Sequence, residues 1–160
     1  MKNLRTLACA ALAVAGIGAA MTGTQAVTAP AASADSGDFL ITRDVPTLAD
    51  LNAQVEFLVE KPASDETKAA NLEGGMNAVV VPRTVYNLGL FRAPLGWNEV
   101  TGPETHSGDE HTAVLHSNSS GRPGIVMQVT WKRIDGSWKM ANSSLCEGVE
   151  AVGLSIPCNF

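Results

Sequence analysis

The sequence has few aromatic residues and no cluster of basic side chains. Only 5% of its residues are aromatic, and 16 acidic residues outnumber 11 basic ones, which gives a formal charge of −5. Nucleic acids and anionic membrane surfaces are bound through clustered Lys and Arg, so this composition argues against both as partners. After residue 34 no apolar run approaches the ~20 residues of a membrane span. Phosphate-loop, dinucleotide and serine-hydrolase motifs are also missing.

The first 34 residues have the composition of a secretory signal peptide. Lys2 and Arg5 precede an uncharged, alanine-rich segment, and Ala32-Ser33-Ala34 offers a small-x-small cleavage site before Asp35. A cut after Ala26 is the alternative, at a poorer match. We therefore expect a protein that is secreted or associated with the cell envelope after cleavage.

Cleavage after Ala34 makes the remaining chain more acidic. Without the two basic residues of the leader, nine Lys and Arg face sixteen Asp and Glu, a formal charge of −7. The remainder is long enough to bury one core. We expect a flexible N-terminal tail over residues 35–45 and a single domain over residues 46–160.

Cysteine is scarce, with three in the whole chain. Cys9 lies in the expected leader, which leaves Cys146 and Cys158 in an oxidising compartment, where a disulfide is the first expectation. It would close a loop of about a dozen residues and stabilise the fold by roughly 3 kcal/mol. A reactive thiol needs a neighbouring base, and a pair of metal-binding cysteines needs further ligands. The residues spaced around Cys146 and Cys158 supply neither.

The stretch from Ile125 to Ala141 predicts a β-hairpin. Apolar and polar residues alternate along its first half, and Asp135-Gly136 is the dipeptide that a type I′ turn prefers. With that turn, Trp131 faces Met140, and Trp138 lies on the same side of the hairpin. A slip of one residue would expose both tryptophans, so the register is well specified.

Two helices are expected before the hairpin. Thr47 and Asp50 form a capping box for the first, which ends at Lys61-Pro62. A second helix over residues 65–73 would end at Gly74-Gly75. The rest has weaker patterns, which predict a helix after Pro82 in the ambiguous segment 76–92, a strand over 95–100, a polar loop over 102–110, a strand over 112–116 and a short helix over 142–152.

Three of these stretches resemble one known family. They are Asp44-Val45-Pro46-Thr47, Lys68 with Leu72-Glu73-Gly74-Gly75, and the hairpin segment Gly136-Ser137-Trp138-Lys139-Met140. Together they resemble the secreted low-molecular-weight antigen family of mycobacteria and related actinobacteria. The resemblance implies an α+β fold of the cystatin-like or nuclear-transport-factor-like kind, in which N-terminal helices pack on a curved antiparallel sheet of about four strands. It brings no catalytic residue with it.

The chain departs from the family pattern in two places. Val79–Pro82 interrupts a region where the family has helix, which puts that helix in doubt. The tail that carries Cys158 extends beyond the usual short C-terminus, so the disulfide rests on composition alone.

No set of polar residues indicates a reaction or a bound metal. His111 and His116 lie five apart on one expected strand and so face opposite sides, while His106 falls in the expected loop. We expect surface histidines, no metal and no cofactor. The carboxylate pairs Asp65-Glu66 and Asp109-Glu110, like Glu147 with Glu150, are expected to be solvated.

The residues that could line a pocket are apolar, namely Trp97, Trp131, Trp138 and Met140. The alternative is that the first helix simply covers them. Three functional classes follow: a non-catalytic exported protein that binds an apolar or cell-envelope ligand or another protein, a small isomerase- or hydrolase-like enzyme on the same fold, and a secreted inhibitor. A polar pair deep in the sheet would favour the enzyme, an empty apolar cavity the binder, and a protruding loop at 102–110 the inhibitor.

Overall fold

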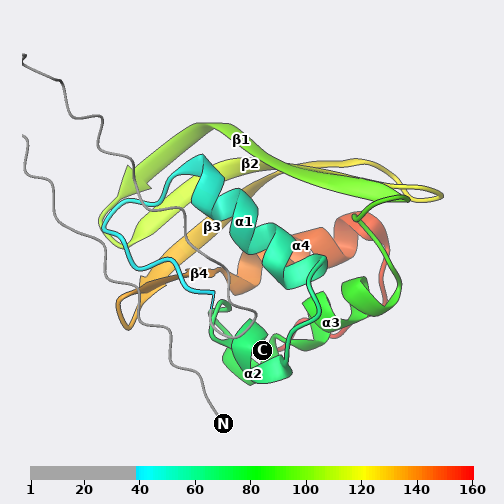
Figure 1. Ribbon diagram of the computed structural model, residues 1–160, viewed down its shortest axis with the longest axis horizontal. Helices are drawn as coiled ribbons and strands as arrows, with labels where there is room; N and C mark the ends of the chain where they lie inside the picture. The colour runs from blue at the N-terminus through cyan, green and yellow to red at the C-terminus, as the bar shows by residue number, and fades with distance from the viewer. Residues whose placement is uncertain (1–38) are drawn as a thin grey trace, which may run out of the picture. The chain divides into compact units, whose positions relative to one another are not determined.

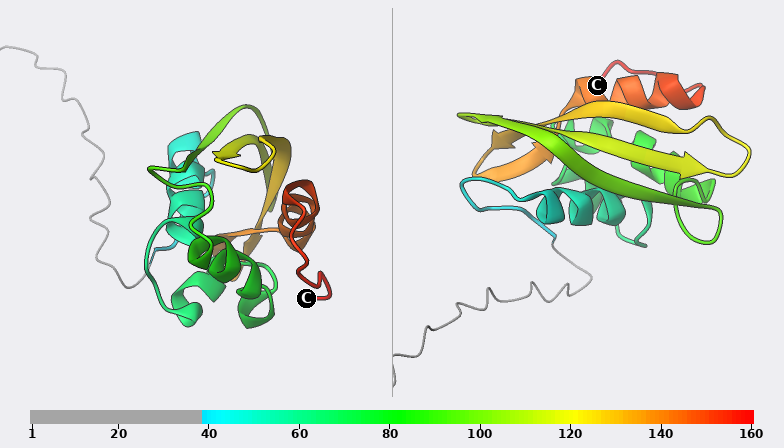
Figure 2. Two further views of the ribbon diagram at one scale, coloured as in Figure 1. Left: turned by 90° about the vertical axis from the view of Figure 1, so that its right-hand side faces the viewer. Right: turned by 90° about the horizontal axis from the view of Figure 1, so that it is seen from above.

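The computed structural model describes residues 39–160, so the expected leader and the cleavage sites lie outside the described residues. Four antiparallel strands form one open sheet in the order β1-β2-β3-β4, and the helices pack against its concave face (Figures 1 and 2). This is the expected α+β class. In chain order the elements are α1 (Leu48–Val59), α2 (Asp65–Ala69), η1 (Gly75–Asn77), α3 (Val80–Asn87), β1 (Gly96–Ser107), β2 (Glu110–Ser119), β3 (Ile125–Ile134), β4 (Ser137–Met140) and α4 (Asn142–Val152). Within the described part, no helix is both long and apolar enough to cross a bilayer.

The β3–β4 hairpin has the predicted turn and register. Asp135 and Gly136 both have positive φ, +53° and +79°, as a type I′ turn requires. Trp131 pairs with Met140 across the two strands, and both Trp131 and Trp138 are completely buried. The local sequence therefore determines this part of the sheet.

Helix α1 begins at the predicted capping box and buries an apolar stripe. The Thr47 side chain accepts a hydrogen bond from the Asp50 backbone, and the Asp50 side chain accepts one from the Thr47 backbone. Leu51 and Leu58 are among its buried residues. Phe57, on another face of the helix, stacks on Phe39 with ring centroids 5.5 Å apart.

The segment before α1 is packed, which corrects the expected flexible tail for residues 39–45. Ile41 is 4% exposed, and its carbonyl accepts a hydrogen bond from the Trp138 backbone N–H at 2.9 Å. The Arg43 carbonyl accepts another from the Trp138 indole N–H, also at 2.9 Å. The sequence lacks periodicity here because a single extended segment lies along the edge of β4.

The expected loop over residues 102–110 is wrong, because most of it belongs to β1 and β2. Residues 102–110 are exposed, which hides the alternation that marks a half-buried strand. The pairing of Thr101 with Val114 shifts before it resumes at Thr105 with Thr112, and the bulge holds Pro103. A proline is tolerated there because β1 is an edge strand.

Two helix boundaries also differ from the expectation. Helix α2 ends at Ala69 rather than Glu73, because the next residues turn and bring Leu72 beside Met140 in an isolated bridge. Helix α3 begins two residues before Pro82. Proline fits in a first helical turn, where the backbone N–H has no partner within the helix.

Other parts of the chain cover the edge of β4 and a part of the edge of β1, whose outer half is exposed. Beside β1, the Asn52 side chain of α1 accepts a hydrogen bond from the Val100 backbone N–H at 3.0 Å. Beside β4, the Met140 backbone N–H donates to the Asn71 carbonyl at 2.9 Å, and the Met140 carbonyl accepts from the Glu73 N–H at 3.0 Å. These contacts add to the Ile41 contact with Trp138.

Candidate functional site

One end of the concave face is filled by a buried polar network around Gln54. The Gln54 amide donates to the Asn71 side chain and to the Trp138 carbonyl, each at 2.8 Å, and its oxygen accepts from the Trp131 indole N–H at 2.8 Å. Gln54 and Asn71 are 0% exposed. Because these polar atoms are paired, the network joins α1, the turn after α2 and the β3–β4 hairpin without an unsatisfied group.

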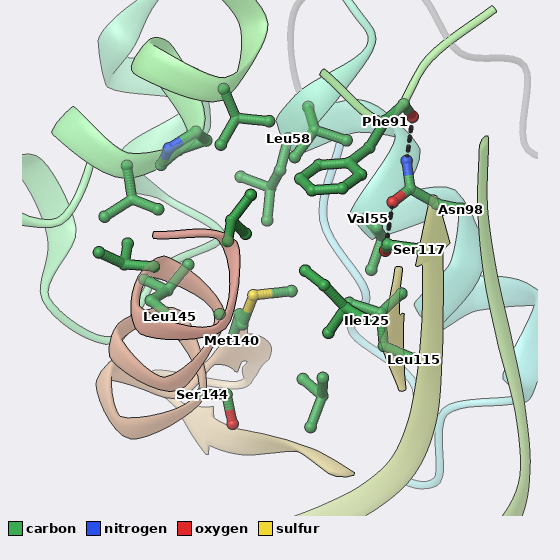
Figure 3. A pocket seen from close by; sticks show the side chains of 18 of the residues that line it. Val55, Leu58, Phe91, Asn98, Leu115, Ser117, Ile125, Met140, Ser144 and Leu145 are labelled. Atoms are coloured by element: carbon green, nitrogen blue, oxygen red, sulfur yellow. Dashed lines mark hydrogen bonds between the residues drawn. The ribbon is translucent and has the colours of Figure 1, made fainter. Parts of the chain in front are cut away.

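The other end of the concave face, toward the β2–β3 turn, contains an apolar cavity of about 80 Å³ (Figure 3). Its walls come from α1, α3, α4, all four strands, and the segments that follow α3 and α4. The lining residues are Val55, Leu58, Val59, Val81, Pro82, Val85, Phe91, Asn98, Leu115, Ser117, Ile125, Met127, Val129, Met140, Ser144, Leu145, Gly148, Val149, Val152 and Leu154.

The three polar side chains in this wall are all hydrogen-bonded to the protein. Ser117 donates to the Asn98 side-chain oxygen at 2.7 Å, and the Asn98 amide donates to the Phe91 carbonyl and to Glu60, the latter at 3.2 Å (Figure 3). Ser144 Oγ accepts the Thr130 backbone N–H at 2.9 Å. None of the lining residues is titratable. The wall can hold hydrocarbon but offers no acid, base or metal ligand.

Of the four residues expected to line a pocket, Met140 does so. Trp131 and Trp138 are at the filled end, where both indole N–H groups are hydrogen-bonded. Trp97 is 50% exposed and borders a shallow surface hollow with Leu48 and Glu99. The hairpin register predicted the correct face of the sheet for the two tryptophans. The position of the cavity along that face depends on tertiary packing, which the register does not determine.

Sequence reasoning missed most of the wall, although two signals pointed to it. The stripe of α1 contributes Val55 and Leu58, and Gly148 leaves α4 without a side chain opposite Met127. A Cβ built on Gly148 would be 3.8 Å from the Met127 sulfur, so the glycine leaves room rather than avoiding a clash. The contribution of α3 could not be foreseen while that segment was ambiguous.

Of the three histidines expected at the surface, His111 is buried, His116 is half-buried and His106 is exposed. His106 lies on β1 rather than in a loop, paired with His111 on β2, and His111 is 1% exposed. His111 Nε2 is 3.2 Å from a Glu104 oxygen, while its Nδ1 has no partner. His116 faces the other side of the sheet, as predicted, with Nε2 3.1 Å from the Thr101 hydroxyl. Among residues 39–160 no three His, Cys, Asp or Glu side chains gather closely enough to hold a metal.

One carboxylate outside the expected pairs is held by two donors. Glu73 accepts from Lys132 Nζ at 2.7 Å and from the Asn142 backbone N–H, the first residue of α4, at 2.8 Å. Partial burial opposes the charged form, but the hydrogen bonds from Lys132 and Asn142 outweigh it and lower the pKa of Glu73. This carboxylate acts as a cap for α4, at the positive end of the helix dipole.

A buried lysine, Lys68, caps the C-terminal end of α1. Lys68 is 3% exposed, donates from Nζ to the Leu58 carbonyl in the last turn of α1 at 2.7 Å, and lies 4.6 Å from the centre of the Tyr86 ring. Burial lowers the pKa of Lys68. Its contacts are those of a structural cation at a helix C-terminus, and it does not line the cavity.

The remaining expected features have the following positions. Cys146 on α4 and Cys158 in the C-terminal tail are joined as a disulfide, with Cα atoms 5.6 Å apart. Asp109, Glu110, Glu66, Glu147 and Glu150 are exposed, and Asp65 is partly exposed beside Arg83.

Comparison with known proteins gives one match. The family described as low molecular weight antigen MTB12, C-terminal domain, matches residues 44–156, which include α1, all four strands and α4. No curated protein matches the chain.

Proposed function

Because the chain belongs to the low molecular weight antigen MTB12 family, we propose that it is an exported, non-catalytic protein that binds a small apolar ligand in the cavity between the helices and the sheet. The observation that carries this proposal is the chemistry of the wall. Its polar side chains are already paired within the protein, and it has no titratable group. Such a wall favours hydrocarbon over any ligand that needs a hydrogen bond.

The cavity volume limits the size of the ligand that fits. An apolar cavity of roughly 150 Å³ stays dry and binds benzene, whereas this one measures about 80 Å³. Each buried methylene is worth about 0.8 kcal/mol. A polar atom inside the cavity would lose its hydrogen bonds to water without finding a free partner, which costs about 1–3 kcal/mol. The ligand, or the part of it that enters, is therefore a short hydrocarbon group.

The enzyme alternative has less support. General acid–base or nucleophilic catalysis needs a titratable or nucleophilic side chain beside the bound substrate. The cavity offers only Asn98, Ser117 and Ser144, and the serines have no His, Lys or carboxylate as a hydrogen-bond partner.

The inhibitor alternative also lacks the feature that would have favoured it. A protruding loop at 102–110 would have favoured it, but in the described chain these residues belong largely to the β1–β2 hairpin. His106 from this hairpin packs edge-on against Trp138, with ring centroids 5.7 Å apart.

Export is supported by the N-terminal composition and by the disulfide. The small-x-small site at Ala32-Ser33-Ala34 follows a basic and then apolar leader, and a disulfide persists in oxidising compartments. N-terminal sequencing of protein from culture medium should begin at Asp35, and an intact leader there would contradict this part of the proposal.

A cavity-filling variant tests ligand binding. The signal-free, oxidised protein is titrated with 1-hexanol while NMR shifts of cavity methyl groups are followed. Gly148→Leu places a side chain toward the cavity, whereas Ala151→Leu adds the same side chain on the exposed face of α4. Gly148→Leu should weaken binding at least about tenfold, or about 1.4 kcal/mol, and Ala151→Leu should leave it unchanged. Equal binding by both variants, or no binding by the unmodified protein, would contradict the proposal.

A further inference from the structure

The last eight residues of the chain run back along α4 and are fastened at their far end. Gly153, with φ +68°, ends α4 and reverses the chain direction. The tail then returns toward the start of the helix, where Cys158 is bonded to Cys146 and the Phe160 carbonyl accepts a hydrogen bond from the Asn142 side-chain amide at 3.0 Å. We call residues 153–160 the strap.

The strap lies on the side of α4 that faces away from the sheet. At about 100° per residue, Ser144 and Gly148 share one edge of the helix. That edge faces β3, because Ser144 bonds the Thr130 N–H and Gly148 lies opposite Met127. Cys146 projects from the opposite edge. Figure 2, left, shows the tail leaving α4 on the side of the green helices α2 and α3.

The strap forms part of the cavity wall between α3 and α4. Leu154 lines the cavity together with Val85 of α3 and Val152 of α4. Ile156 and Phe160 are partly buried against the same hydrophobic core. Three hydrogen bonds hold the strap: Gly153 N–H to the Glu150 carbonyl and Leu154 N–H to the Val149 carbonyl, each at 3.0 Å, and the Phe160 contact. Apolar side chains and the disulfide supply its other contacts.

We propose that the strap closes the α3–α4 side of the cavity and that its displacement admits the alkyl chain of an amphiphile. The inference rests on the proposed function and names the ligand class. A cavity of about 80 Å³ takes the end of a chain, and further methylenes need the space that Leu154 and Ile156 occupy. The alkyl chain of the amphiphile then takes over the apolar contacts that Leu154 and Ile156 made. Its head group has no hydrogen-bond partner in the cavity wall and stays in water.

Chain-length dependence tests the strap. Binding of straight-chain alkanoates from about six to about fourteen carbons is measured by calorimetry, with an expected gain of about 0.8 kcal/mol per methylene until the chain no longer fits. In the oxidised protein the gain should stop at short chains. In the double variant Cys146→Ser/Cys158→Ser the limit should move to longer chains by about four carbons, with hexanoate affinity within about threefold.

Two further variants and a ligand-free readout make the test decisive. Asn159→Ala, at an exposed position of the strap with the disulfide intact, should behave like the unmodified protein. If the double variant does not fold, Ile156→Ser loosens the strap while the disulfide stays closed. Without ligand, either loosening should accelerate amide hydrogen exchange in α3 and α4 but not around Trp131.

The outcomes separate the two proposals. If alkanoates bind with the same length limit in every variant, or if exchange in α3 and α4 is unchanged, the strap does not close the cavity and only this inference fails. If no alkanoate binds any of the proteins, the proposed function fails, and the inference fails with it.

Discussion

Gln54 connects three segments that are far apart in the sequence. Its side chain bonds Asn71, the Trp138 backbone and the Trp131 indole, with 0% of the residue exposed. No sequence pattern identified it, because a glutamine on a helix is ordinarily a surface residue. It became a central residue only through the packing of the hairpin on α1.

We predict that Gln54→Leu destabilises the protein by about 3 kcal/mol or more, because it leaves buried polar partners unsatisfied at about 1–3 kcal/mol each. Chemical denaturation monitored by tryptophan fluorescence measures the loss. Gln128→Leu, at an exposed position on β3, is the matched control and should change stability by less than about 0.5 kcal/mol. Similar effects of the two substitutions would contradict the assigned network.

Glu73 gives a prediction about pH. Its pKa is lowered from 4.5 in the folded protein, so its ionised form stabilises the fold above the unfolded pKa, and this contribution is lost as the pH falls through the folded value. Glu73→Gln should therefore cost about 0.5–1 kcal/mol at neutral pH. The difference from the unmodified protein should shrink as the pH falls below 4.5. Unfolding curves measured from neutral pH to below pH 4.5 test this prediction, with Glu147→Gln on the exposed face of α4 as the control. A stability difference between Glu73→Gln and the unmodified protein that grows toward acid pH would refute the stabilising role of ionised Glu73.

At the scale of elements, the parts determined locally were predicted and the parts determined by packing were not. The capping box of α1 and the Asp135-Gly136 turn each depend on a few neighbouring residues. The outer half of β1 was mistaken for a loop because its residues are exposed on both faces of the strand. The cavity was not predictable, since its wall combines separate elements whose spacing no single stretch encodes.

Two glycines should respond to alanine in opposite directions. Gly148 lies within α4, and its added Cβ makes an ordinary 3.8 Å contact, so Gly148→Ala should stabilise the protein by roughly 0.5–1 kcal/mol. A Cβ at Gly74 would be 2.8 Å from the Asn142 side-chain oxygen and 3.0 Å from the Ala78 Cβ, so Gly74→Ala should destabilise. Thermal unfolding of both variants measures the two changes in stability. A shift of the melting temperature in the same direction for both would contradict the prediction.

At the scale of the whole molecule, the disulfide joins α4 to the end of the chain. The two cysteines are 12 residues apart, so the bond should contribute roughly 3 kcal/mol. Cys146→Ser/Cys158→Ser should lower the unfolding free energy by about that amount. Reductant should destabilise the unmodified protein to a similar extent and leave the double variant unaffected; a reductant effect on the double variant would place the sensitivity elsewhere.

The covered sheet edges have a consequence for assembly. An open strand edge is a template on which a second chain can add a strand, which is one route to peptide capture and to fibrils. Here the Asn52 side chain occupies a backbone donor on β1, and the segments around Ile41 and Asn71 occupy the outer side of β4. A chain joining β4, or β1 beside Val100, would first have to displace the segment around Ile41 or the Asn52 side chain of α1. The fold therefore resists strand-by-strand growth at β4, whereas at β1 the exposed outer half leaves residues 102–107 as the place where such growth could begin.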